Sequence, residues 1–99
     1  TATSGSGPAY FFAFVEAMVD GAVALGLTSE DATALTIQTI VGAAALLEKS
    51  GDSPTTLREK VTSPNGTTAA ALASFSQDHL ADIVARAMTA AHARSQELA

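Results

Sequence analysis

Apolar residues recur along this chain at the 3.6-residue spacing of α-helices, in segments separated by glycine, proline and capping residues. The first segment, 8–25, begins behind Ser6-Gly7-Pro8 and ends before Gly26. Proline is tolerated in the first turn of a helix, and glycine suits the position just after the last turn. The pattern therefore predicts a long first helix.

This first predicted helix is apolar on almost every face. Its charges, Glu16 and Asp20, share one narrow edge. Two apolar stripes cover most of the remaining circumference: Phe11, Val15, Met18, Ala22 and Leu25, and Tyr10, Phe14 and Ala17. A helix that is apolar nearly all round is normally buried. Because a domain of this size has little material to cover it, we predict that the helix lies between elements of more than one subunit.

A second long helix is predicted from Thr28 to residue 49 or 50. Thr28 suits the N-cap, and Glu30 and Asp31 fall in the first turn, where the helix dipole favours acids. Gly51 supplies the stop. The β-branched residues at 36–41 favour a strand weakly, but the caps and the length favour a helix.

Three shorter or later helices complete the predicted fold. Ser53 suits the N-cap of a third helix that has Pro54 at its first position. The chain breaks before Pro64, a fourth helix opens at Thr67, and Asp78 is predicted to cap a fifth. The sequence therefore predicts one all-α domain over residues 1–99, with about five helices, of which the two N-terminal ones are long.

The composition favours an oligomer. Hydrophobic residues make up 47% of the 99 residues and charged residues only 15%, whereas charged residues make up about 25% of an ordinary soluble domain. With so few charges, the surface either exposes apolar patches or buries them against a partner. We therefore expect this chain to associate.

Charge and cysteine content exclude several functions. The net charge is -5 and the five Lys and Arg residues are scattered, so we expect no nucleic-acid partner and no anionic membrane surface. No run of about 18 uninterrupted apolar residues predicts a membrane span. The absence of cysteine excludes disulfides and thiolate metal ligands and fits a reducing compartment, so we expect a cytoplasmic protein.

Few residues offer acid–base or metal chemistry. His79 and His92 have no motif around them and are interpreted as surface histidines. Glu16 and Asp20 lie one turn apart and could form a carboxylate pair, although a solvent-facing polar edge is the favoured interpretation. We therefore predict no metal site.

The loop 61–68 is different, because it ends one helix and begins another within a few residues. If the N–H groups of Gly66, Thr67 and Thr68 are unpaired at a helix N-terminus, they attract an anion such as a carboxylate or a phosphate. The hydroxyl groups of Ser63, Thr67 and Thr68 add donors and acceptors. From these residues alone, an anion site and a capped interhelical turn with nothing bound both remain possible.

At this loop the chain resembles the pyrroline-5-carboxylate reductase family, whose members catalyse the last step of proline synthesis. The resemblance rests first on Leu57 and on Val61-Thr62-Ser63-Pro64-Asn65-Gly66-Thr67-Thr68, and second on the opening Ser4-Gly5-Ser6-Gly7-Pro8-Ala9-Tyr10. It extends over almost the whole chain, through Asp20-Gly21, Gly26-Leu27, Gln38-Thr39, Gly42-Ala43-Ala44 and the closing Arg94-Ser95-Gln96-Glu97-Leu98.

The resemblance implies a helical dimerisation and substrate-binding domain that interlocks with a second copy in a homodimer or a higher homo-oligomer. It implies reduction of pyrroline-5-carboxylate to L-proline by a hydride from NADPH or NADH. The substrate carboxylate would bind at Ser63, Gly66 and Thr67, and the Thr68 hydroxyl would reach the ring nitrogen as the catalytic contact. The cofactor chemistry would need only orientation and charge neutralisation from these residues.

Two departures from the family stand out. Asn65 occupies the place of a second glycine, and Asp78-His79-Leu80 replaces a frequent Gly-Gly-Phe. Asn tolerates positive φ better than most residues, so the turn should persist.

The cofactor domain of the family has no counterpart in this chain, which lacks a strand followed by a glycine-rich turn. The chain also starts without Met or a signal peptide. We therefore expect a piece of a longer enzyme, inactive alone and with its cofactor bound mainly by another domain. The alternative is a non-catalytic helical oligomerisation module.

Overall fold

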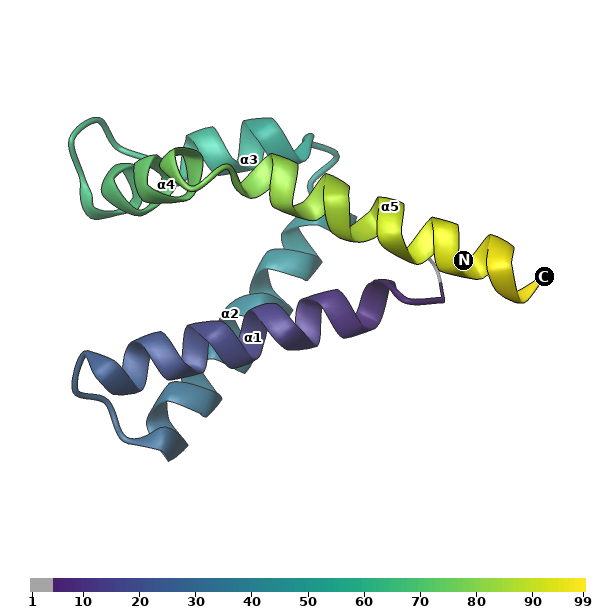
Figure 1. Cartoon of the computed structure of the whole chain (residues 1–99). Helices are drawn as coiled ribbons and strands as arrows, with labels where there is room; N and C mark the ends of the chain where they lie inside the picture. Colours follow the sequence, from purple (N-terminus) through teal and green to yellow (C-terminus); the bar gives the residue numbers. More distant parts are fainter. Residues whose placement is uncertain (1–4) are drawn as a thin grey trace. The chain divides into compact units, whose positions relative to one another are not determined.

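The computed structural model describes residues 5–99 as five α-helices joined by short connections (Figure 1). No strand occurs among these residues. The helices are α1 (Gly7–Ala24), α2 (Ser29–Lys49), α3 (Pro54–Lys60), α4 (Thr67–Gln77) and α5 (Leu80–Leu98). The all-α prediction, with two long N-terminal helices, is confirmed.

The chain divides into two compact units. Pro8–Ser53 forms one and carries almost all of α1 and the whole of α2. The other unit contains α3, α4 and α5, and there α4 and α5 are in contact. The candidate loop between α3 and α4 therefore belongs to the second unit.

The junction between α1 and α2 follows the predicted signals. Gly26 adopts a φ of +115°, and the N–H of Leu27 donates to the carbonyl of Ala22 at 3.1 Å. This is the Schellman arrangement that ends a helix at a glycine. Two residues later, the Thr28 hydroxyl accepts a hydrogen bond from the N–H of Asp31 at 3.1 Å and caps α2.

The junction between α4 and α5 differs from the prediction. Asp78 does not cap α5, because it is still the C-cap of α4, where its N–H donates to the carbonyl of Ser74 at 3.1 Å. The chain turns one residue later, at His79, which has φ 61° and ψ 50° and makes no capping bond through its side chain. The prediction of an Asp78 cap was therefore wrong by one residue, and the replacement adopts the left-handed conformation that glycine accommodates best.

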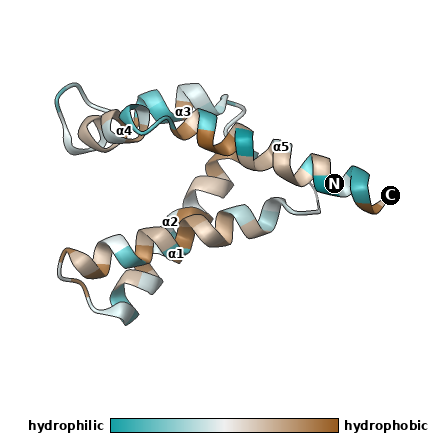
Figure 2. Cartoon of the chain, in the orientation of Figure 1, coloured by the Kyte–Doolittle hydropathy of each residue, from teal (hydrophilic) through white to brown (hydrophobic). Residues whose placement is uncertain are grey.

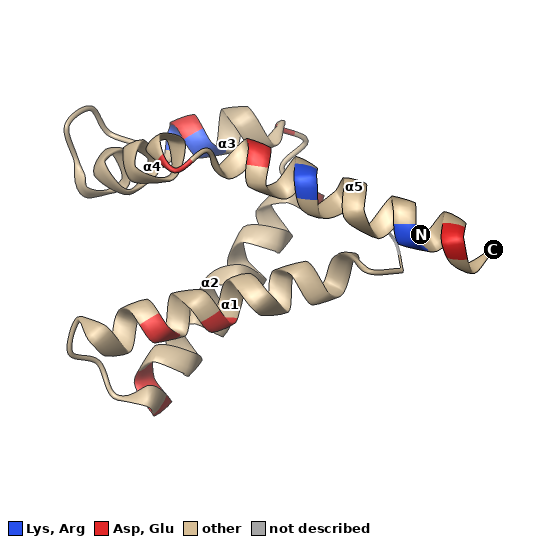
Figure 3. Ribbon diagram, viewed as in Figure 1, with Lys and Arg blue, Asp and Glu red and all other residues tan. Residues whose placement is uncertain are grey.

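Large apolar side chains remain exposed in the single chain. Ala32 is the one buried hydrophobic residue among the described residues, and Thr36, one turn later on α2, is buried beside it in the sequence pattern. On α1, Phe11 is 63% exposed and Phe12 is 67% exposed. Figure 2 shows the apolar character of this helix, and Figure 3 shows that its charged positions are acidic. The chain alone therefore leaves the apolar faces of α1 uncovered.

No helix within residues 5–99 combines the length and the hydropathy that a membrane crossing requires.

Candidate functional site

The predicted site residues lie together in the loop that joins α3 to α4. The loop leaves α3 through Thr62, whose hydroxyl donates to the carbonyl of Arg58 at 2.6 Å. The N–H of Thr62 donates to the carbonyl of Glu59 at 3.2 Å. Both bonds satisfy carbonyl groups at the end of α3 that have no partner within the helix, so they fix the start of the loop.

A tight turn over 63–66 forms the centre of the loop. The N–H of Gly66 donates to the carbonyl of Ser63 at 3.1 Å, and Asn65 has a φ of 61°. A positive φ at the third residue, with Pro64 before it, is the pattern of a type II turn. The expectation that Asn65 would preserve the turn is confirmed.

The turn changes which N–H groups can meet an anion. The sequence predicted a free N–H at Gly66, but this group is bonded to the carbonyl of Ser63. The reason is the turn itself, which requires a bond between its first and fourth residues. Gly66 therefore contributes to the site by its shape, and the candidate backbone donors are the N–H groups of Thr67 and Thr68.

The missing side chain of Gly66 lets Ser63 approach closely. A Cβ atom at residue 66 would lie 2.8 Å from the Ser63 Oγ atom and 3.3 Å from the Ser63 carbonyl oxygen. The φ of Gly66 is -89°, which any residue can adopt. Glycine is therefore needed here for contact and not for backbone conformation.

The N-terminus of α4 lies directly after this turn. Gly66 is its N-cap, no side chain makes a capping hydrogen bond, and no acidic residue occupies the first turn. The first N–H groups of a helix have no partner within it, and the helix dipole adds partial positive charge there. Thr67 is exposed and Thr68 is half-buried. This arrangement can receive a carboxylate through backbone donors and the Ser63 hydroxyl.

Other candidate chemistry is not assembled by the described residues. His79 lies 3.9 Å from Asp82, with the two side chains 72% and 69% exposed. Glu16 and Asp20 are exposed on α1. Among residues 5–99, no group of three or more His, Asp or Glu side chains is arranged to hold a metal ion. The loop is therefore the candidate site that the structure supports.

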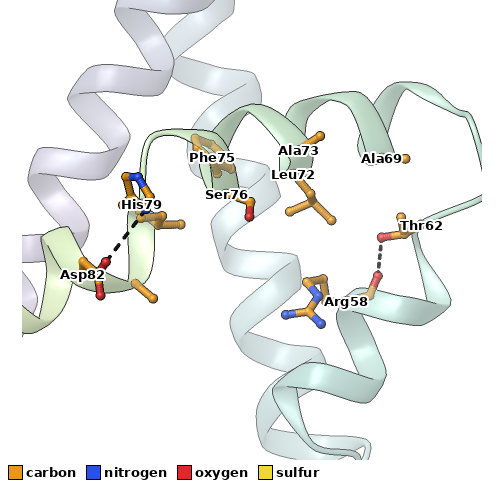
Figure 4. A pocket seen from close by; sticks show the side chains of 11 residues that line it. Arg58, Thr62, Ala69, Leu72, Ala73, Phe75, Ser76, His79 and Asp82 are labelled. Carbon is orange, nitrogen blue, oxygen red and sulfur yellow. Dashed lines mark hydrogen bonds and ion pairs between the residues drawn. The ribbon is translucent and has the colours of Figure 1, made fainter.

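One feature beside the loop escaped the sequence analysis. A groove of about 810 Å³ lies between α3, α4 and the start of α5, and Thr62 and Ala69 bring it next to the loop (Figure 4). Its lining includes Arg58, Thr62, Ala69, Leu72, Ala73, Phe75, Ser76, His79, Leu80, Ala81 and Asp82. The i, i+3 pair Leu72 and Phe75 was the available signal, but it indicates only an apolar face of a helix.

Known proteins resemble the chain over its whole length. Residues 1–98 match the family described as pyrroline-5-carboxylate reductase dimerisation. A pyrroline-5-carboxylate reductase from Pseudomonas aeruginosa is 52% identical over 99 residues, which are 100% of this chain and 36% of that protein. A pyrroline-5-carboxylate reductase from Arabidopsis thaliana is 45% identical over 98 residues, which are 99% of this chain and 36% of that protein.

Solved structures show the same fold. A pyrroline-5-carboxylate reductase from Coxiella burnetii matches with a TM-score of 0.95 and 45% identity, over 99% of this chain and 36% of that one. The Plasmodium falciparum pyrroline carboxylate reductase, solved with NADP bound, matches with a TM-score of 0.94 and 36% identity, over 98% of this chain and 39% of that one. The chain thus spans little more than a third of the length of these relatives. By its sequence and its fold, the chain belongs to the pyrroline-5-carboxylate reductase dimerisation family.

Proposed function

We propose that this chain is the helical dimerisation and substrate-binding domain of a pyrroline-5-carboxylate reductase, which reduces 1-pyrroline-5-carboxylate to L-proline with NADPH or NADH. The observation that carries the proposal is the uncapped N-terminus of α4 behind the close Ser63–Gly66 contact. Such a terminus suits a carboxylate. The membership of the family supports pyrroline-5-carboxylate as the molecule that carries it.

Each residue of the loop has a distinct role in this proposal. The substrate carboxylate accepts hydrogen bonds from the N–H of Thr67 and from the Ser63 hydroxyl. Gly66 leaves the room for Ser63 to stand where it does. The half-buried Thr68 hydroxyl contacts the ring nitrogen and is the catalytic residue of this domain. Because Thr67 and Thr68 are adjacent on α4, their side chains diverge by about 100° and serve different parts of one ligand.

The described residues do not fit a nicotinamide cofactor by themselves. Residues 5–99 form helices only, without the strand and glycine-rich turn that bind a dinucleotide. We therefore assign NADPH or NADH mainly to a domain outside this chain, and we expect the chain alone to be inactive. A cysteine-free chain suits the reducing cytoplasm, where we place the enzyme.

The proposed partner is a second copy of the chain. Phe11 and Phe12 on α1 are more than half exposed, and Ala32 is the one buried hydrophobic side chain in the described part. A stable domain needs far more apolar burial than this. We propose that the copies interlock as a homodimer or a higher homo-oligomer and form the missing core between them.

The site can be tested in the full-length reductase that carries this domain. We expect Thr68→Ala to lower kcat/KM by about 100-fold, since one enclosed contact to a transition state contributes roughly 2.7 kcal/mol or more. Ser63→Ala should mainly raise KM. Thr33→Ala is the matched control, because its hydroxyl bonds within α2 to the carbonyl of Ser29. Unchanged kinetics in both loop variants would contradict the site assignment.

The alternative function is a helical oligomerisation module without a substrate, which the exposed apolar face of α1 favours equally. Titration of the isotope-labelled chain with L-proline separates the two functions. Shifts of the Thr67 and Thr68 amide resonances are expected from a substrate-binding domain. A chain that dimerises but shows no such shifts at saturating proline would support the module instead.

A further inference from the structure

The groove between α3, α4 and the start of α5 has the chemistry of a seat for a helix. Leu72, Phe75 and Leu80 give it apolar walls, and Phe75 and Leu80 are still 41% and 39% exposed. Arg58 contributes a cation from α3 (Figures 3 and 4). At the α5 end, Asp82 lies beside His79. An occupant of this groove needs large apolar side chains together with a carboxylate near Arg58.

The helix α1 meets both requirements. Phe12, Glu16 and Asp20 follow one another at intervals of four residues, so they share one side of α1. Phe12 is 67% exposed, and both acidic residues are exposed. No Lys or Arg occurs in α1, whereas α2, α3 and α5 each contain at least one. Of the five described helices, α1 alone combines exposed aromatic residues with a purely acidic edge.

We propose that α1 of a second copy of this chain lies in the groove, with Phe12 against Leu72 and Phe75 and with Glu16 and Asp20 toward Arg58. The proposal rests on the homodimer proposed above and names the surfaces that meet. In a two-fold dimer each contact occurs twice, since every copy offers one groove and one α1. The groove adjoins Thr62, so the partner helix would also support the start of the candidate loop.

Charge reversal tests this pairing without removing apolar surface. Arg58→Glu places like charges at both symmetric contacts, and so does the double substitution Glu16→Arg with Asp20→Arg. Because like-charge contacts at an interface are strongly unfavourable, each variant should raise the dimer dissociation constant by roughly 10- to 100-fold. Arg86→Glu and Glu48→Arg are the matched controls, since neither residue lines the groove. Sedimentation of the full chain over a concentration series measures all of them.

The decisive step is to mix the two defective variants. A heterodimer of the Arg58→Glu chain and the Glu16→Arg, Asp20→Arg chain has opposite charges at both contacts. We therefore expect the mixture to recover a dissociation constant within a few-fold of the unaltered chain. A contact within one chain cannot be restored in this way. Circular dichroism of each variant and of the mixture shows whether a weakened variant also loses its helices, and recovery of helix on mixing counts as support.

The outcomes separate this proposal from the homodimer itself. If both charge-reversal variants dimerise like their controls, the groove assignment is overturned while the homodimer stands. If they weaken but the mixture does not recover, the assignment is overturned as well, because the charges then act elsewhere. If the unaltered chain is a monomer at all concentrations, the homodimer fails and this proposal fails with it.

Discussion

Replacing Gly66 by Ala should weaken ligand binding while leaving the fold intact. The added Cβ would lie 2.8 Å from the Ser63 Oγ atom and 3.3 Å from the Ser63 carbonyl oxygen. The backbone of residue 66 has φ -89°, so alanine can adopt it without strain. The Ser63 hydroxyl can leave by rotating about χ1, but its backbone carbonyl cannot move without disturbing the turn. We therefore expect the substitution to displace the hydroxyl.

The size of the effect follows from what the displaced hydroxyl does. A hydrogen bond to a charged group contributes about 1.5–3 kcal/mol, and the lower end applies because Ser63 is exposed to solvent. A loss of about 1.5 kcal/mol corresponds to a roughly tenfold weaker affinity for a carboxylate ligand. The free energy of unfolding should change by less than about 1 kcal/mol, since alanine is only a somewhat poorer N-cap than glycine.

Titration of the isotope-labelled chain with L-proline measures this affinity, even where it is weak. Ser63→Ala should weaken binding to a similar degree, because it removes the same hydroxyl. The double variant Gly66→Ala, Ser63→Ala should be hardly worse than either single variant, since both act through one group. Gly21→Ala is the matched control, because an added Cβ there meets nothing within 4 Å. Unchanged binding in Gly66→Ala, or additive losses in the double variant, would refute the reasoning.

Two further predictions concern stability and are measured by urea unfolding at one fixed protein concentration. Thr28→Ala removes the cap of α2 and should cost about 1 kcal/mol, whereas Thr33→Ala, within the same helix, should cost nothing; equal losses would contradict the role of the cap. His79→Gly relieves a left-handed backbone and should gain about 1 kcal/mol; a loss would mean that contacts of the His79 side chain outweigh the strain.

The sequence predicted the helix ends well where the signals are local and unopposed. Gly26 and Thr28 lie on either side of the first connection, and each does in the structure what its chemistry favours. Pro64 and Asn65 likewise specify their turn within four residues. Such signals succeed because the groups that they pair are neighbours in the chain, so no tertiary contact has to be known.

Where two local signals compete, the sequence was not sufficient. Asp78 is a good N-cap residue, but α4 keeps its N–H, and His79 takes the left-handed turn. The free N–H predicted at Gly66 was wrong for a similar reason, because the turn uses it. The groove could not be predicted at all, because it depends on how α3, α4 and α5 meet. No spacing within one helix contains that information.

The loop explains why a domain like this one would recognise a substrate without being able to hold it. Its donors are the Ser63 hydroxyl and backbone N–H groups at a helix end that is largely open to solvent. Two such bonds to a carboxylate contribute roughly 3–4 kcal/mol, and the loss of ligand freedom opposes them. The net affinity therefore lies no tighter than about the millimolar range. Tight and productive binding requires another surface to close over the loop and exclude water, and this requirement follows from the exposure of Ser63 and Thr67 alone.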